Sequence, residues 1–507
     1  MSSAPADADS LLRLLRDRGV ILSARGTALD FDAPAGALTD DLIDAMRRLK
    51  PDILARLAGD TDEVERTAPA SVAQARQFHL TMASDTPETL TVAMRFALHG
   101  PLDHPALRQA LTDLVARHPA LRTRYAVHDG EVVQQVLAPR PQPLTVVDVT
   151  PDRLDATIQD FCAAPFALET EPAYRALLVR VDDPAAAHGR HELALAMHHG
   201  IIDGWSTEIL VRDLGELYRA ALTGQPADLP PLAADFIDFC RWERDFLATE
   251  RTRDMVRTWA DRVGPGTEPI RLPTDRPRPA TRSSAGAYVT DSIPADLLDA
   301  VTRYAVRRNV TPFVVLTAAF AVLLQELTDR STIPLTSSVA NRTDPRFANV
   351  VGVLTQAPWL VVELRGTRTF DELVDRTAAA TWQMLAMQSV PAQVQSAALG
   401  DQFTGNPPRV YLTMLDMADP VLRLPGLAPA PARDVLLTGA RADQVWQLRP
   451  LDDGGLSLII EYATALFDAG TVARWAARYR SLLRHALTEP GTWPRSEQAG
   501  PPRPSDR

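Results

Sequence analysis

The sequence predicts an α/β fold built as two halves behind a small N-terminal unit. Apolar runs of strand length alternate with helical segments along the chain, which is typical of α/β domains. The 507 residues are more than one hydrophobic core usually holds. Between about residues 246 and 290 the composition changes to Arg, Pro and Thr. We therefore expect two halves, 67–245 and 291–488, joined by an extended connector, 246–290.

Composition restricts the classes of function. The formal charge of −11 argues against nucleic-acid binding, which normally needs a basic face. Lys50 is the only lysine, so a catalytic lysine elsewhere in the chain is excluded. Cys162 and Cys240 lack the spacing of a zinc site, and both are expected to be buried, inert thiols in apolar helical segments. No metal is predicted.

The sequence carries no signal for export or for a membrane. Acidic residues interrupt the N-terminus early, and no apolar signal core follows them. The most apolar helical segment, 311–324, is too short to cross a bilayer and is expected in a core. We expect a cytoplasmic protein without a membrane partner.

Residues 1–58 are expected to fold as a small unit. Its strands would leave an open edge, and such an edge can accept a peptide strand from a partner. The expected elements are a helix over 11–15 that ends at Gly19, a hairpin of 20–23 and 28–32, a helix after Thr39 and a helix from Pro51.

The main body follows a polar linker, 59–67, and is expected to end in a disordered, proline-rich tail, 489–507. In the first half we expect a helix from 71–80, a helix passing into a strand within 117–125, and an aromatic helical segment, 236–242. In the second half we expect helices at 297–307, 311–324 and 471–487, and strands at 333–339, 360–364, 410–415 and 456–462.

The strongest chemical signal lies in residues 197–206. His198 and His199 end an alternating apolar strand, and Asp203-Gly204 opens a helix. A strand end beside a helix N-terminus suits a base and stabilises developing negative charge. Adjacent residues of an extended chain point to opposite sides, so only one of the two histidines can face a given cleft. A lone buried histidine is usually structural, and the rest of the chain must decide.

Five stretches, taken in chain order, resemble motifs of the condensation domain of nonribosomal peptide synthetases over about residues 67–488. The matching stretches are 71–80, 117–125, 197–206 with the active-site pattern His-His-x-x-x-Asp-Gly, 236–242 and 351–356. Gln356 stands where Asn is usual, Leu354 replaces Phe, and a sixth motif is reduced to 387–391. The resemblance implies two chloramphenicol-acetyltransferase-like halves in a V-shaped pseudodimer. Carrier-borne substrates would enter a tunnel between them from opposite sides.

The resemblance also implies roles for individual residues. His199 would be the base or the group that positions the amine. Gly204 would leave room for the pantetheine arm or the oxyanion and would offer its N–H. His198 would support the site from behind. Asp203 would form a buried salt bridge with Arg342, which assigns both residues to the architecture of the site.

The implied reaction transfers a donor acyl or peptidyl thioester to an amine and forms an amide. Both substrates would be carried on the 4′-phosphopantetheine of donor and acceptor peptidyl carrier proteins, with no cofactor bound covalently to this chain. Because no carrier or adenylation segment follows, we expect a free-standing protein. An alcohol acceptor, which would give an ester, and a non-catalytic recruitment module are the alternatives. The intact histidine pair argues against the second.

Residues 1–58 resemble the TubC-type docking domains of synthetase subunits, with a helix, a hairpin and further helices in the same order. Such domains capture the C-terminal tail of an upstream subunit along the hairpin. The resemblance therefore implies a synthetase subunit as a partner, held close by this segment through effective concentration.

Overall fold

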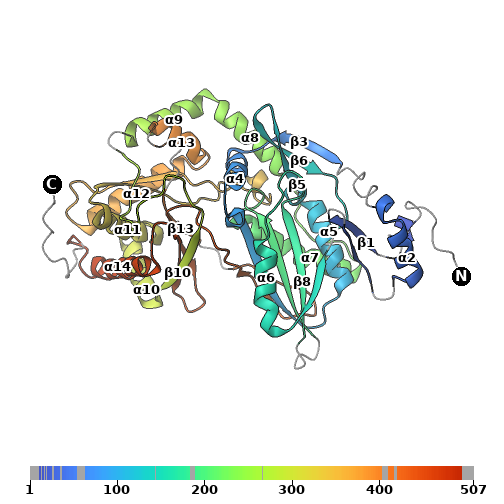
Figure 1. The fold of residues 1–507 in the computed structure, drawn as a ribbon. Helices are drawn as coiled ribbons and strands as arrows, with labels where there is room; N and C mark the ends of the chain where they lie inside the picture. The colour runs from blue at the N-terminus through green and yellow to red at the C-terminus, as the bar shows by residue number, and fades with distance from the viewer. Residues whose placement is uncertain are drawn as a thin grey trace.

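The computed structural model describes residues 11–12, 14–15, 18, 20–25, 28–34, 37–53, 63–142, 144–182, 189–264, 267–401, 403, 409–415 and 419–493. Figure 1 shows two α/β halves side by side, with the N-terminal unit at the outer end of the first half. The predicted two-half α/β architecture is confirmed.

The N-terminal unit has its own small core. Its hairpin pairs β1 (Ile21–Arg25) with β2 (Ala28–Asp32), and α2 (Asp40–Arg48) begins after Thr39, as predicted. The buried side chains of this unit are Leu11, Leu15, Val20, Leu42, Ala45, Met46, Leu49 and Ile53. Gly19, the hairpin turn at 26–27 and residues 54–58 lie outside the described residues.

The first half is built on two largely antiparallel sheets, ordered β16-β4-β9-β8-β7 and β3-β6-β5. The edge strand β16 (Arg433–Asp434) comes from the second half. Its strands are β3 (Val64–Pro69), β4 (Thr91–His99), β5 (Thr123–His128), β6 (Glu131–Leu137), β7 (Thr145–Val149), β8 (Tyr174–Val181) and β9 (Arg190–His198). Its helices are α4 (Val72–Met82), α5 (His104–Arg117), α6 (Leu154–Ala163), α7 (Gly204–Thr223) and α8 (Phe236–Ala248).

Local sequence explains where α4 begins. The Ser71 hydroxyl accepts a hydrogen bond from the Gln74 N–H, and the Gln74 side chain accepts one from the Ser71 N–H. This reciprocal capping box satisfies two amides that have no partner within the helix. The motif that resembles the family pattern over 71–80 therefore acts first as a helix start.

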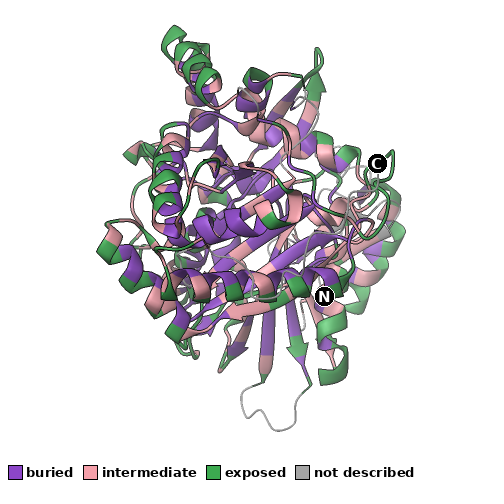
Figure 2. Cartoon of the chain, turned by 90° about the vertical axis from the view of Figure 1, so that its left-hand side faces the viewer, coloured by how far each residue is buried: buried purple, intermediate pink, exposed green. Residues whose placement is uncertain are grey.

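The second half is built on a mixed sheet ordered β10-β18-β17-β13-β11-β12. Its strands are β10 (Gly286–Ile293), β11 (Thr332–Thr336), β12 (Trp359–Glu363), β13 (Val410–Met414), β17 (Gln444–Pro450) and β18 (Leu456–Ala463). Its helices are α10 (Ala295–Arg308), α11 (Pro312–Thr328), α12 (Phe370–Ala386), α13 (Ala392–Leu399) and α14 (Ala469–Thr488). Figure 2 shows buried residues along the strands and exposed residues on the outer faces of the helices.

Two segments of the second half reach into the first. The short strand β16 (Arg433–Asp434) pairs with β4, after the small hairpin of β14 (Val421–Leu422) and β15 (Ala430–Pro431). The segment 340–356 packs on α7 and α8, where Phe347 stacks edge-on against Phe239 and Trp242. The halves are therefore interlocked by chain crossings.

The expected extended connector over 246–290 is wrong for much of its length. α8 continues to Ala248, α9 (Glu250–Val263) follows it, and β10 already begins at Gly286. Val256 and Trp259 bury one face of α9 beside Trp359 and Met387. The exposed face of α9 is rich in Arg and Asp, and these charged residues obscured the helical spacing in the sequence.

Three smaller expectations also need correction. Residues 64–67 of the predicted linker belong to β3, which pairs with β6. The strand expected over 333–339 ends at Thr336, and Val339 makes only an isolated bridge with Gln356. Residues 489–493 are not a free tail, because the Thr492 carbonyl accepts from the Phe370 N–H. Residues 494–507 lie outside the described residues.

Among the described residues, no single helix has both the length and the apolar composition to span a bilayer. α10 and α11 meet that test only as a pair, across a bend of 107°.

Candidate functional site

The candidate site lies where β9 passes into α7. β9 is paired with β4 on one side and β8 on the other, and its side chains from His191 to His198 are buried. Asp203 caps α7, because its Oδ1 accepts from the Ser206 N–H at 2.8 Å. A turn of four residues, 199–202, is thus held between a central strand and a helix N-terminus.

His199 is half-buried in this turn. Its Nδ1 lies 2.9 Å from the carbonyl oxygen of Ile202. A carbonyl can only accept, so Nδ1 carries the hydrogen and Nε2 is left with a free lone pair. Burial lowers the pKa of His199, and the positive charge of Arg441 lowers it further. His199 is therefore a neutral imidazole that can accept a proton at Nε2.

His198 has a different environment, although it is the next residue. Its Nδ1 accepts from the Gly200 N–H at 3.0 Å, so its hydrogen is on Nε2, which lies 2.7 Å from the Thr81 hydroxyl oxygen. That hydroxyl donates in turn to the Gln77 carbonyl. Burial, followed by the charge of His199, lowers the pKa of His198 to about 3. Both ring nitrogens of His198 are engaged within the protein.

The glycine after His199 is required by its surroundings. The Tyr125 hydroxyl donates to the Gly200 carbonyl at 2.8 Å, and Tyr125 is fully buried. A Cβ at Gly200 would lie 2.7 Å from that hydroxyl and 2.9 Å from Nδ1 of His198. Tyr125 ends the stretch 117–125, but its contact with this turn was not predicted. Tyr125 lies on β5, which belongs to a different sheet from β9, so no local pattern announces that contact.

Asp203 and Arg342 form a buried, two-point ion pair. Nη1 of Arg342 lies 3.0 Å from Oδ2, and Nη2 lies 3.1 Å from Oδ1. The side chains are 1% and 4% exposed for Asp203 and Arg342, respectively. Burial alone would raise the pKa of Asp203, but the charge and hydrogen bonds of Arg342 outweigh it and hold that pKa below its usual range.

The remaining contacts of Asp203 tie α7 to the second half. Oδ2 accepts from the Leu354 N–H at 3.0 Å, and from the N–H and hydroxyl of Thr355 at 2.9 and 3.0 Å. Oδ1 accepts from the Ser206 hydroxyl at 2.7 Å. Among the described residues, the hydrogen bonds of Asp203 run to α7 and to the segment 340–356, and not to His199. Ser206 and Thr355 were missed, although Ser206 stands three residues after the cap, where a capping contact is common.

Gly204 is the first residue of α7 and is exposed. A Cβ built at this position meets no atom within 4 Å, so the protein leaves open space beside the Gly204 backbone. Its N–H belongs to the first helical turn, where amides have no acceptor within the helix. The neighbouring Trp205 donates its indole N–H to the Ala348 carbonyl at 3.3 Å.

Other candidate chemistries find little support. Burial raises the pKa of the Cys162 thiol to about 12 and also raises that of Cys240, so neither is a ready nucleophile. In the described part of the chain, no group of three or more His, Cys, Asp or Glu side chains is placed to hold a metal.

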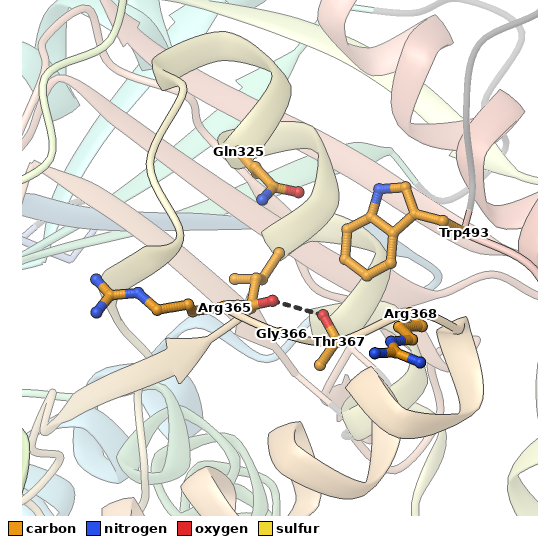
Figure 3. Close-up of a pocket in the computed structure, with 7 residues that line it drawn as sticks. Gln325, Arg365, Gly366, Thr367, Arg368 and Trp493 are labelled. Atoms are coloured by element: carbon orange, nitrogen blue, oxygen red, sulfur yellow. Dashed lines mark hydrogen bonds between the residues drawn. The ribbon is translucent and has the colours of Figure 1, made fainter.

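A pocket of about 440 Å³ lies in the second half, away from this turn (Figure 3). It is lined by Gln325, Leu364, Arg365, Gly366, Thr367, Arg368 and Trp493. None of these residues belongs to the motif at 197–206, so the candidate site is a different place.

Comparison with known families gives two matches. Residues 64–401 match the Condensation domain, and residues 9–58 match the TubC N-terminal docking domain. Phosphinothricin tripeptide synthetase PhsC of Streptomyces viridochromogenes is 31% identical over 434 residues, which are 83% of this chain. The chain spans 39% of PhsC, and smaller shares of other synthetases that it matches.

Two solved structures have the same fold at 25% identity. The X-domain from teicoplanin biosynthesis has a TM-score of 0.74 and matches 83% of this chain and 95% of its own. The same kind of domain is also known in a complex with OxyB. The SgcC5 protein of Streptomyces globisporus, solved with a naphthyl ethanediol and sucrose, has a TM-score of 0.69 and matches 84% of this chain and 99% of its own.

Proposed function

The chain belongs to the condensation-domain family, and from that premise we propose that it joins a carrier-bound donor acyl thioester to an amine, forming an amide. The observation that carries this proposal is the state of His199. Its Nδ1–H is fixed on the Ile202 carbonyl, so a neutral imidazole offers Nε2 beside the N-terminus of α7. A base with this geometry suits aminolysis at neutral pH.

The lone pair of the neutral amine attacks the thioester carbonyl carbon, and the carbonyl π electrons move to oxygen. Nε2 of His199 takes the proton that the nitrogen loses. When the intermediate collapses, the C–S bond breaks, its electrons go to sulfur, and sulfur takes the proton from His199. The products are an amide and the free thiol of the donor arm.

In this proposal the other motif residues position the reactants. The open space at Gly204 would admit a pantetheine arm, and the amides of the first turn of α7 would face the developing oxyanion. Asp203 and Arg342 would hold α7 against the second half. His198 would fix the turn through Thr81 and the Gly200 amide.

We assign the substrates to partner proteins. Donor and acceptor groups would arrive on the phosphopantetheine arms of peptidyl carrier proteins. The hairpin of residues 1–58 would bind the C-terminal tail of the donor's subunit by strand addition, because β1 and β2 pair only with each other in the described part of this unit. Tethering would then raise the local concentration of the donor.

The direct test measures product by mass spectrometry with loaded donor and acceptor carriers. We expect His199→Ala to lower the rate by about 10²–10⁴-fold, the usual contribution of a general base. His128→Ala is the matched control. The His128 side chain is 79% exposed at the end of β5 in the β5–β6 hairpin, outside the motif at 197–206. A wild-type rate in His199→Ala would overturn the assignment of His199.

A second function, recruitment without catalysis, is favoured by one observation. The X-domain that resembles this chain forms a complex with OxyB. If the wild-type protein binds carriers but forms neither amide nor ester across a broad panel of donors with amine and alcohol acceptors, recruitment replaces condensation as the better proposal.

A further inference from the structure

A second ion pair lies at the seam between the halves, close to the turn that carries His199. Arg441 precedes β17, and Glu461 lies in β18. The Arg441 N–H donates to Oε1 at 2.6 Å, Nε donates to Oε2 at 3.0 Å, and Nη2 lies 2.9 Å from Oε2. Glu461 therefore fixes both the backbone and the guanidinium of Arg441.

The two partners differ in exposure. The side chain of Glu461 is 2% exposed and that of Arg441 is 31% exposed. Here the carboxylate is enclosed, whereas part of the guanidinium is left uncovered.

Chain contacts bring Arg441 to the candidate site. β16 pairs with β4, and the Val435 N–H donates to the Ala93 carbonyl. At Gly439 the crossing is so tight that a Cβ would lie 2.0 Å from the Thr89 hydroxyl oxygen. The next residue of the first half, Leu90, accepts from the His199 N–H at 2.7 Å. Arg441 therefore lies two residues after Gly439, which contacts Thr89 next to the residue that binds the His199 N–H.

The charges around His199 are few. His198 precedes it on β9 and is neutral. Asp203 faces it from the start of α7, and its carboxylate is already paired with Arg342. Arg441 belongs to the second half, and its positive charge lowers the pKa of His199 more than any other cause except burial.

We propose that Arg441 is a positioning residue of the condensation site: anchored by Glu461, it holds a positive charge at the seam beside the turn that carries His199. That charge favours the neutral, proton-accepting imidazole. This inference rests on the proposed function of His199. It adds an electrostatic task for a residue outside the motif.

The test is an NMR titration of the imidazole signals with ¹³C-labelled histidine, which needs no turnover. The chain has 10 histidines, and the spectrum of His199→Ala assigns the His199 signal. We expect Arg441→Gln to move the His199 midpoint upward by about half a pH unit or more. Arg441→Lys should keep the midpoint near wild type, because it keeps the charge.

Two further variants make the result decisive. Arg478→Gln removes an equally charged, partly exposed arginine from its pair with Glu326 in the same half, and should leave the midpoint unchanged. Arg441→Gln with Glu461→Gln avoids an unpaired buried carboxylate, and it decides the matter if the single variant does not fold.

In active preparations, the acid limb of the rate–pH profile should move upward with the His199 midpoint. An unchanged midpoint in folded Arg441→Gln, or in the double variant, would overturn the role of Arg441. A wild-type protein that never forms product, with a midpoint that still depends on Arg441, would overturn the proposed function and leave this electrostatic contact intact.

Discussion

His198 and His199 are chemically identical neighbours, and their hydrogen-bond partners give them opposite tautomers. The Gly200 amide donates to Nδ1 of His198 and forces its hydrogen onto Nε2. The Ile202 carbonyl accepts from Nδ1 of His199 and leaves its Nε2 bare. These two partners, both within the same short turn, therefore make His198 a structural residue and His199 a proton acceptor. The alternation of side chains along a strand predicts that the two histidines point to opposite sides. Their tautomers follow only from the hydrogen bonds of the turn.

His198 should also make stability depend on pH. Its folded pKa is lowered to about 3, from 6.5 in the unfolded chain. The unfolded state therefore takes up a proton first as pH falls. The stability that this group contributes is complete above about pH 6.5 and is lost as pH falls from there toward 3, by about 1.4 kcal/mol per pH unit.

His198→Asn removes this titration and can retain an acceptor for the Gly200 amide. We expect its free energy of unfolding to fall less steeply than that of wild type between about pH 6.5 and about pH 4.5. Urea unfolding at several pH values measures both slopes. Parallel slopes would show that His198 is protonated in the folded state at these pH values.

The segment 340–356 is the element that joins the second half to α7. It brings the Arg342 guanidinium and the Leu354 and Thr355 amides to one carboxylate, that of Asp203. Close packing adds to these bonds, because a Cβ at Gly352 would lie 2.4 Å from the Phe236 ring. The site's shape therefore depends on an element that contains none of the motif histidines.

Breaking this joint should be costly. Asp203→Ala or Arg342→Ala leaves a buried charge unpaired and is expected to destabilise the protein by roughly 3–5 kcal/mol. The double variant should cost less than the sum of the two single variants, because it leaves no lone charge. Urea unfolding measures all three.

Arg346→Ala is the matched control from the same segment. Its pair with Asp344 is largely exposed, so the unfolding midpoint should stay near that of wild type. Additive losses in the double Asp203 and Arg342 variant would contradict direct coupling of the two residues.

The sequence predicted the helices and strands better than the contacts between them. The helix start at Gly204 and the strand before His198 follow from local spacing and capping. α9 was missed, because its apolar residues Val256 and Trp259 stand within an arginine-rich stretch. Their packing partners, Trp359 and Met387, are distant in sequence and are known only from the structure. Tyr125 reaches the turn from the neighbouring sheet, and Arg441 comes close through a chain crossing. No local pattern encodes either arrangement. The resemblance named Arg342, but Thr355 and Ser206 emerged only from the structure.

At the scale of the whole molecule, the interlocked halves contrast with the N-terminal unit. β16 and the segment 340–356 cross between the halves, whereas, among the residues that the structure describes, the core of the unit contains only residues from Leu11 to Ile53. Removing the unit therefore should not open either large core. We expect residues 59–507 to unfold at nearly the same urea concentration as the full chain.

The same deletion should separate encounter from chemistry. With an excised donor carrier, kcat and KM should match those of the full chain, because the site is intact. With a donor carrier that keeps the C-terminal tail of its own subunit, deletion should raise KM by about 10–100-fold and leave kcat unchanged, since only the effective concentration is lost. A peptide of that tail should inhibit the full chain and spare the deletion variant. Equal KM values with the tailed donor would show that residues 1–58 do not dock it, and the strand edge of β1 and β2 would then need another partner.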